Sequence, residues 1–285
     1  MRIAVTGATG FVGRAIADHL VSLGHEVVGI SRAGDVALDL TSPDFADRLA
    51  VSTLPCETIV HCAASLDKDY LSQSMLLCNV LGTQSVVRLA LLWKCKTLIY
   101  MSSVPVIGVP QVLPIDESHP TAPVTGYHAA KLLGEQLVAL ANSNALRTLS
   151  YRLSAPVGPR MPRNRILPVF VRQARRNETI CLAGKGTRTQ NYVDVRDIAH
   201  AVEQGLNTVV DGVFNIAGDH SISNLDLARL CISLNASESD IAFSAEVDPE
   251  ENLRWEVSIA RARKSLRYKP ACSLEDSILA ISREI

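Results

Sequence analysis

The sequence has little net charge, few aromatic residues and no pair of cysteines at metal-binding spacing. Its formal charge is −1 and only 5% of its residues are aromatic, so neither electrostatic attraction nor base stacking favours a nucleic-acid partner. The seven cysteines are odd in number and form no C-x-x-C pair, which indicates neither a disulfide framework nor a zinc site. We therefore expect free thiols, no metal and a cytoplasmic location.

Long hydrophobic runs are also missing. No apolar run approaches the roughly 18 residues that a membrane helix needs, and glycines break the short N-terminal run too early for a signal peptide. We therefore expect neither a membrane partner nor export. What remains is an ordinary globular composition of 285 residues, 47% hydrophobic and 20% charged, which is long enough for a large domain and a smaller one.

Short β-branched runs alternate with longer helical patterns along the first half of the chain. The predicted strands are residues 3–6, 25–30, 58–61, 96–103 and 147–154, and the predicted helices are 11–24, 72–93 and 125–142. This alternation is typical of an α/β fold with right-handed crossovers and helices on both faces of a parallel sheet. The sequence predicts a Rossmann-type doubly wound sheet in residues 1–155. It predicts a smaller mixed substrate-binding lobe in 156–285, with a segment near 189–216 returning to the sheet.

A glycine-rich segment joins the first predicted strand to the first predicted helix. Gly7, Gly10 and Gly13 have the spacing G-x-x-G-x-x-G. Glycine permits a tight turn and close approach of a pyrophosphate, and the helix N-terminus offers free N–H groups at its positive dipole end. A plain glycine-rich turn is the alternative. The strand before the segment and the helix after it favour dinucleotide binding.

The end of the second predicted strand bears on the choice of cofactor. Ser31 and Arg32 occupy the region where an NAD enzyme would carry an acidic residue for the ribose hydroxyls. A hydroxyl beside a guanidinium suits a 2′-phosphate instead, because arginine can bind phosphate with two hydrogen bonds. The sequence therefore favours NADP, while an exposed surface arginine and the nearby Asp35 keep NAD possible.

Tyr127 and Lys131 lie one helical turn apart, on the same face of the predicted helix. For an isolated pair of this kind, simple packing is the common explanation. The alternative is acid–base catalysis, in which a neighbouring ammonium lowers the pKa of the phenol. Ser103 favours catalysis, because it ends a predicted strand at the sheet edge where ligands bind and can hydrogen-bond a substrate oxygen.

These residues belong to a series of motifs that resembles the extended short-chain dehydrogenase/reductase family, in particular its NAD-dependent epimerase/dehydratase branch. The motifs are TGATGFVG, VHCAA, NVLGT, SSVPVIG, YHAAK and YRLSAPVGP, in the family's order and over essentially the whole chain. The resemblance implies that Tyr127 transfers a proton, Lys131 lowers its pKa and holds a ribose, and Ser103 binds the substrate oxygen. It also implies cofactor contacts from Phe11, Val12, Asp39, Leu40, Ala63, Ala64, Asn79 and Pro156.

Arginines cluster between residues 160 and 176, where no acidic residue occurs. Those at 172, 175 and 176 fit the solvated face of a helix. Arg163, Arg165 and Arg188 instead suit an anionic substrate, such as the diphosphate of a nucleotide sugar or another phosphorylated or carboxylated molecule. Ser65 and Ala155 are also expected on the substrate side, although Ala155 stands where the family commonly has asparagine.

The sequence thus predicts an NAD(P)-dependent epimerase or reductase that acts at a carbinol or keto carbon of a nucleotide-activated sugar. Elimination is not expected, because Val104 and Pro105 stand where the dehydratase subgroup carries Asp-Glu. An NADPH-dependent ketoreductase of a different small molecule and a cofactor-binding sensor without turnover remain alternatives. Family analogy also implies a homodimer through the helices near 72–93 and 125–142.

Overall fold

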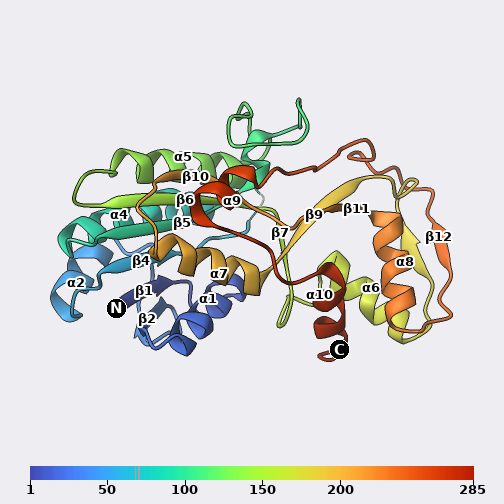
Figure 1. Cartoon of the computed structure of the whole chain (residues 1–285), viewed down its shortest axis with the longest axis horizontal. Coiled ribbons are helices and arrows are strands. Elements are labelled where there is room, and N and C mark those ends of the chain that lie inside the picture. The colour runs from blue at the N-terminus through green and yellow to red at the C-terminus, as the bar shows by residue number, and fades with distance from the viewer. Residues whose placement is uncertain (68, 70) are drawn as a thin grey trace.

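The computed structural model describes residues 1–67, 69 and 71–285, which form a larger half built on a sheet and a smaller lobe (Figure 1). The sheet has seven parallel strands in the order β10-β6-β5-β4-β1-β2-β3. This arrangement confirms the predicted Rossmann-type fold. The strands are β1 Arg2–Thr6, β2 Glu26–Ser31, β3 Val36–Ala37, β4 Thr58–His61, β5 Thr97–Ser103, β6 Arg147–Leu153 and β10 Gly212–Ile216.

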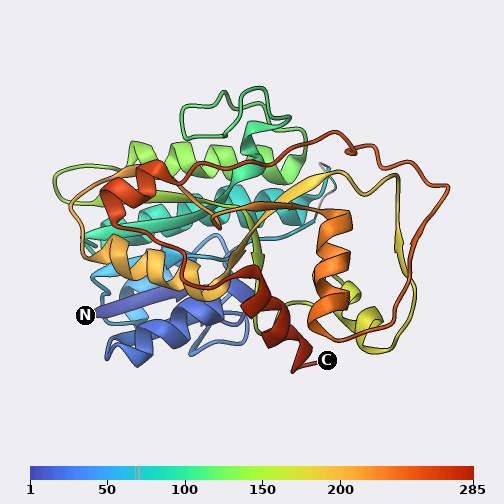
Figure 2. The same ribbon diagram turned by 45° about the vertical axis from the view of Figure 1, so that its right-hand side comes forward.

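Helices cover both faces of the sheet, because alternate side chains of each strand point to opposite faces. In β1, Ile3 and Val5 belong to one apolar core and Ala4 to the other. One face is covered by α1 (Phe11–Ser22), α7 (Val195–Leu206) and α9 (Ala260–Leu266) (Figures 1 and 2). The other is covered by α2 (Phe45–Ser52), α4 (Gly82–Leu92) and α5 (Gly126–Leu140).

The strand order reverses beside β1. The chain runs outward from β1 to β2 and β3, and then returns to place β4 on the other side of β1. The crossovers on either side of that point leave the sheet in opposite directions, which opens a crevice at the carboxyl ends of β1 and β4. The glycine segment lies at the carboxyl end of β1, so the fold places it at this crevice.

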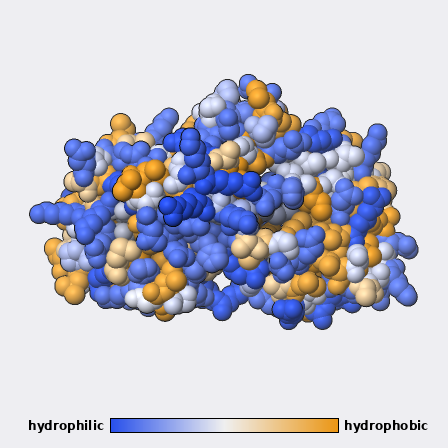
Figure 3. Space-filling model, in the orientation of Figure 1, coloured by the Kyte–Doolittle hydropathy of each residue, from blue (hydrophilic) through white to orange (hydrophobic). Residues whose placement is uncertain are grey.

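The lobe has its own apolar core, formed by three helices and two small sheets. The helices are α6 (Ile166–Arg175), α8 (Asn224–Leu234) and α10 (Leu274–Ser282) (Figure 2). The larger sheet pairs β7 (Ala155–Val157), β9 (Thr189–Asp194) and β11 (Ser221–Ser223), and the smaller pairs β8 (Ile180–Leu182) with β12 (Ile241–Phe243). On the face seen in Figure 3, apolar residues gather over the lobe at the lower right.

The chain crosses between the two halves repeatedly. After β9 in the lobe, α7 and β10 lie with the large sheet, and the chain then goes back to β11. A further return occurs near the C-terminus, where α9 and Tyr268 pack into the core under the sheet. Because the buried face of α9 contacts β10, this C-terminal segment belongs to the sheet half. The sequence analysis had placed the C-terminal region mostly in the lobe.

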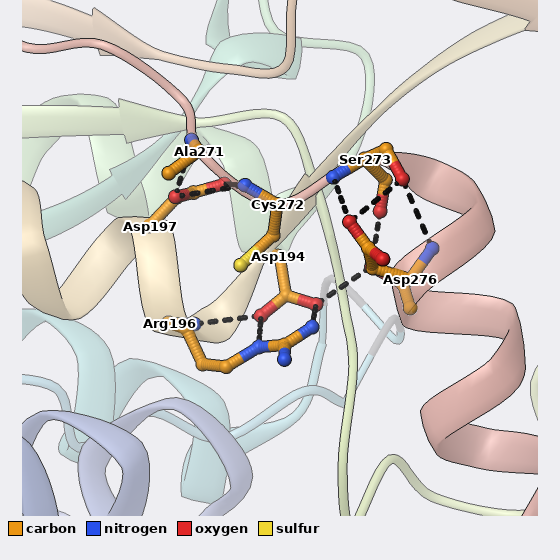
Figure 4. A network of polar contacts seen from close by, with 8 residues as sticks. Asp194, Arg196, Asp197, Ala271, Cys272, Ser273 and Asp276 are labelled. Carbon is orange, nitrogen blue, oxygen red and sulfur yellow. Dashed lines mark hydrogen bonds and ion pairs between the residues drawn. The ribbon is translucent and has the colours of Figure 1, made fainter.

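A polar network ties α10 of the lobe to α7 of the sheet half (Figure 4). Asp194, at the end of β9, accepts two hydrogen bonds from the Arg196 guanidinium, each 2.8 Å, and one of 2.6 Å from the Ser277 hydroxyl. The Asp197 carboxylate accepts hydrogen bonds from the backbone N–H groups of residues 271 and 272. Since both carboxylates are almost fully buried, these contacts fix where the chain enters α10.

Among the described residues, one helix is long and apolar enough, by length and composition, to cross a membrane. It spans Gln73–Leu92, has a mean hydropathy of 1.6, and consists of α3 (Gln73–Leu76), a π-helical stretch (Leu77–Leu81) and α4. The sequence analysis expected no such segment, because it searched for unbroken apolar runs, and that expectation was wrong. The finding is weak evidence for a membrane, because core helices pass the same test and α4 packs on the sheet.

Candidate active site

A cavity of about 700 Å³ lies between the sheet half and the lobe, at the carboxyl edge of the sheet. From the sheet half, the glycine segment, the end of β5 and the first turns of α5 line it. From the lobe side, the segment around β7, the start of α6 and residues of β9 line it. The predicted site residues found in its wall are Gly7, Gly10, Phe11, Val12, Gly13, Ala64, Ser103, Tyr127, Lys131, Ala155, Pro156, Arg165 and Arg188.

The glycine segment forms a cradle that larger residues would fill. Gly7 has φ of +68°, and a Cβ there would lie 2.8 Å from the backbone of Ala63. A Cβ on Gly13 would lie 2.2 Å from the carbonyl oxygen of Gly7. Gly10 is the N-cap of α1 and provides no side-chain hydrogen bond, so the first N–H groups of the helix remain available. This geometry fits the pyrophosphate of a dinucleotide.

The start of α5 places Tyr127 and Lys131 beside the end of β5. Thr125 caps the helix by accepting a hydrogen bond of 3.2 Å from the backbone N–H of His128. The Lys131 ammonium donates a 2.7 Å hydrogen bond to the Met101 carbonyl of β5 and lies 5.9 Å from the centre of the Tyr127 ring. Ser103 is the last residue of the same strand. The three predicted catalytic residues therefore share one wall of the cavity.

Burial controls the charge state of the phenol and the ammonium. It raises the pKa of Tyr127 to about 12, while the positive charge of Arg165 acts in the opposite direction. It lowers the pKa of Lys131 to about 8. The protein groups alone therefore do not produce the lowered phenol pKa that the sequence analysis expected, because the burial penalty on the phenolate is the largest effect.

A buried ion pair lies directly behind this wall. Arg152 of β6 donates to both carboxylate oxygens of Glu135 on α5, over 3.0 and 2.9 Å. The hydroxyl of Ser102 donates to the same carboxylate. Three elements are joined at one point, so the pair fixes the position of α5 against β5 and β6. The sequence analysis missed this group, because its members come from segments with no recognisable spacing.

Two further polar groups support the loop after β4. His61 is fully buried between the hydroxyls of Thr6 and Thr83, 2.7 and 3.0 Å from its ring nitrogens, and burial lowers its pKa to about 3. It is therefore a neutral residue that connects β1 to α4 by hydrogen bonds. Asn79 is not in the cavity wall. Its amide forms two hydrogen bonds with the backbone of Ser65, 2.7 and 2.9 Å long, and holds that residue beside the site.

The residues predicted to contact the adenosine end lie outside the cavity wall, around the ends of β2 and β3. Arg32 is exposed, and no ion pair involving it is found among the described residues. Asp35 accepts a 2.8 Å hydrogen bond from a backbone N–H inside β2. Hydrogen bonds from Thr41, and to a smaller extent the charge of Arg32, lower the pKa of Asp39. Leu40 is buried.

The three arginines predicted to meet the substrate have different surroundings. Arg165 lines the cavity, and no carboxylate pairs with it within residues 1–67, 69 and 71–285. Arg188 also lines it, but pairs with Asp248 and Glu250. Arg163 is outside the wall and donates a 2.9 Å hydrogen bond to a carbonyl near the C-terminus, that of Glu284. The geometry therefore leaves Arg165 as the cation most available to a ligand.

The structure adds several residues to the site. The Ser154 hydroxyl lies in the cavity wall, is buried and has no hydrogen-bond partner among the described residues, so it is free to bind a ligand. Asn164, Tyr192 and Asn224 also line the cavity. Asn164 lies next to the arginines already singled out, so their clustering could have pointed to it. The other two come from β9 and α8, and no local signal marks them.

Solved structures that are similar to this chain share its architecture over nearly its full length. UDP-glucose 4-epimerase of Thermotoga maritima superposes with a TM-score of 0.90 at 20% identity, covering 99% of this chain and 98% of the other. UDP-glucuronic acid 4-epimerase of Bacillus cereus, in complex with UDP-glucuronic acid and NAD, gives a TM-score of 0.84 at 22% identity, with 99% and 98% covered. These likenesses support the fold.

Sequence similarity supports a family. The chain is 26% identical to UDP-glucuronic acid decarboxylase 1 of Danio rerio, over 97% of this chain and 71% of that protein. It is 25% identical to a putative UDP-glucose 4-epimerase of Methanocaldococcus jannaschii, over 97% and 95%. Residues 3–217 match the NAD dependent epimerase/dehydratase family. With the cradle, the Ser-Tyr-Lys group and the doubly wound sheet, this match shows that the chain belongs to the NAD dependent epimerase/dehydratase family.

Proposed function

We propose that this enzyme oxidises or reduces a carbinol or keto carbon of a nucleotide-activated sugar, as an epimerase or as a reductase. The observation that carries the proposal is a cavity in which a pyrophosphate cradle, Ser103, Tyr127, Lys131 and Arg165 meet, the last without a carboxylate partner among the described residues. A dinucleotide and an anionic substrate both find complementary groups there. A cofactor-binding sensor would need the cradle, but it would have no use for the three catalytic side chains.

In the proposed mechanism, Tyr127 removes or supplies the proton at the substrate oxygen, and Ser103 holds that oxygen by a hydrogen bond. A bound nicotinamide supplies hydride transfer at the neighbouring carbon. Lys131, fixed by the Met101 carbonyl, places a positive charge beside the phenol. Since burial alone raises the pKa of Tyr127 to about 12, positive charge in the filled site is what would make proton loss possible near neutral pH.

The substrate is proposed to be a nucleotide sugar whose diphosphate binds Arg165. The Arg165 guanidinium, which no carboxylate of the described residues pairs with, can form two charge-assisted hydrogen bonds to phosphate oxygens. The curated relatives named above act on UDP-linked sugars according to their names, which supports the same substrate class here. Ala155 and Asn224, which line the cavity, are proposed to contribute to selection of the sugar.

The catalytic proposal is tested by Tyr127→Phe, with Tyr192→Phe as the matched control in the same cavity. We expect Tyr127→Phe to lower turnover of UDP- and dTDP-linked sugars by about 10²- to 10⁴-fold without weakening cofactor binding, because only proton transfer is removed. Tyr192→Phe should retain most activity. Unchanged turnover in Tyr127→Phe would contradict the proposal. The same assay distinguishes the two activities. Net consumption of reduced cofactor with a keto sugar would identify a reductase. Interconversion of two sugars without net consumption of cofactor would identify an epimerase.

Three further properties are proposed. The family is NAD dependent, and Ser31 with Arg32 supports a finer preference for NADP. The helix Gln73–Leu92 and α5 expose Leu76, Leu77, Leu81 and Leu133, each at least 40% accessible, which supports a homodimer through these helices. All seven cysteines are free, which supports a reducing, cytoplasmic location.

A further inference from the structure

Three side chains with metal-binding atoms meet between α1 and α7. His19 lies in the last turn of α1, and His200 and Glu203 lie on α7. One ligand atom from each residue can be chosen so that all three lie within 4.8 Å of one another. Figures 1 and 2 both show α1 and α7 side by side on one face of the sheet. None of the three residues takes part in the proposed reaction.

The geometry of the group is already close to that of a metal site. The ring nitrogen Nε2 of His19 lies 2.8 Å from a carboxylate oxygen of Glu203, and the ring centres of His19 and His200 are 4.7 Å apart. His200 and Glu203 are three residues apart on one helix and so share a face. Ligand atoms around a tetrahedral zinc ion are about 3.3 Å apart, so small side-chain rotations would bring all three into place.

The surroundings leave the group able to accept a cation. All three residues are partly exposed, so an ion can enter. No hydrogen bond to the His200 ring is found in the part of the chain that the structure describes, and its nitrogens are therefore not occupied by another protein group. The nearby Arg196 is neutralised by Asp194, and the buried carboxylate of Asp197 lies close enough to His200 for the two to interact electrostatically.

We propose that His19, His200 and Glu203 bind a divalent transition-metal ion of the zinc class, with water completing the coordination. Two imidazoles and one carboxylate are a ligand set typical of zinc, and copper and nickel would also bind strongly. The ion links the end of α1 to α7. Along α1, Gly10 lies about 13 Å from His19, at a rise of about 1.5 Å per residue. The ion therefore stabilises α1, whose N-terminus forms part of the glycine cradle, without contacting the cofactor.

The test uses the full chain without a histidine tag, titrated with cobalt(II) and zinc(II). We expect visible absorption bands of protein-bound cobalt that saturate at one ion per chain and disappear on adding zinc. Saturating zinc, about a hundredfold above its dissociation constant, should raise Tm by about 5 °C. His200→Ala and Glu203→Gln should each lose the cobalt bands, whereas His220→Ala, an exposed histidine outside the group, should keep them.

The competing explanation is that His19 and Glu203 form only a hydrogen bond between helices. In that case cobalt would give no saturating bands, or His200→Ala would leave them unchanged, and either result overturns the proposal. Circular dichroism of the metal-free variants checks that the fold is intact. Retention of the native spectrum while the cobalt bands disappear supports the site, and this readout is independent of whether the proposed reaction is correct.

Discussion

At the scale of single residues, Lys131 gives a prediction for stability as a function of pH. Its pKa falls from 10.5 to about 8 in the fold, so between these values the unfolded chain binds more protons and stability rises with pH. Below about pH 8 the buried charge costs about 3 kcal/mol, at about 1.36 kcal/mol per unit. Lys131→Met should therefore be more stable than the parent protein near neutral pH, by up to that amount, and inactive.

Urea unfolding of the apoprotein at about pH 7 and at about pH 10 measures this difference. The advantage of Lys131→Met should shrink as the pH rises, because the native lysine then loses its charge. Lys96→Met is the control, since that side chain is 78% exposed and pairs with Glu57 at the surface. An advantage that stays constant across the pH range would show that packing, and not the buried charge, is responsible.

Arg32 tests the proposed cofactor preference. We expect the protein to bind NADPH more tightly than NADH, and Arg32→Ala to lose about 10- to 100-fold in affinity for NADPH, as removal of a charge-assisted pair of hydrogen bonds predicts. Affinity for NADH should change little. Fluorescence titration with each reduced cofactor measures the dissociation constants for NADPH and NADH. Tighter binding of NADH by the parent protein would remove the basis for the preference.

Residues fixed by local spacing were predictable, and residues fixed by distant segments were not. Gly7, Gly10 and Gly13 lie where the turn requires them, and one helical turn brings Tyr127 and Lys131 to one face. In contrast, Arg163 and Arg165 are two residues apart and look alike in the sequence. The position of Glu284 decides which of them faces the cavity, and no local pattern encodes that position.

At the scale of elements, the pair formed by Glu135 and Arg152 predicts how firmly α5 is held. Both side chains are about 5% exposed, so Glu135→Gln would leave a buried guanidinium without its counter-charge and should cost about 3–5 kcal/mol. Asp47→Asn removes the charge from an exposed pair with Arg88 and should cost under about 1 kcal/mol. Denaturant unfolding of both variants measures the costs, and equal costs would contradict the argument.

The periodicity of apolar residues identified most elements of the sheet half, because each strand and helix there buries one continuous face. It missed α2 (Phe45–Ser52). It also missed β3, which has two residues, and the π-helical turn at Leu77–Leu81, since neither of these two leaves a periodic pattern. It also could not place α9. The amphipathic pattern of that helix shows which face is buried but not which element it packs against. Its partner, β10, is far away in the sequence.

At the scale of the whole molecule, the exposed leucines predict the oligomeric state. We expect twice the chain mass by light scattering, because a second copy would cover the apolar face of Gln73–Leu92 and α5. Leu81→Lys should yield monomers, since Leu81 is 50% exposed and a charge there would be buried in the interface. Val209→Lys, at a position 92% exposed on the loop after α7, is the control. A monomeric parent protein would refute the dimer.

The repeated crossing of the chain between sheet and lobe has a consequence for how this enzyme can be altered. A fragment ending at residue 155 would lack α7, α9 and β10, and would expose to solvent the part of one sheet face that α7 and α9 cover. The substrate-binding lobe therefore cannot be removed, or replaced by the lobe of another enzyme, as one continuous segment. New specificity must come from replacing individual side chains in a wall to which widely separated stretches of the polypeptide contribute.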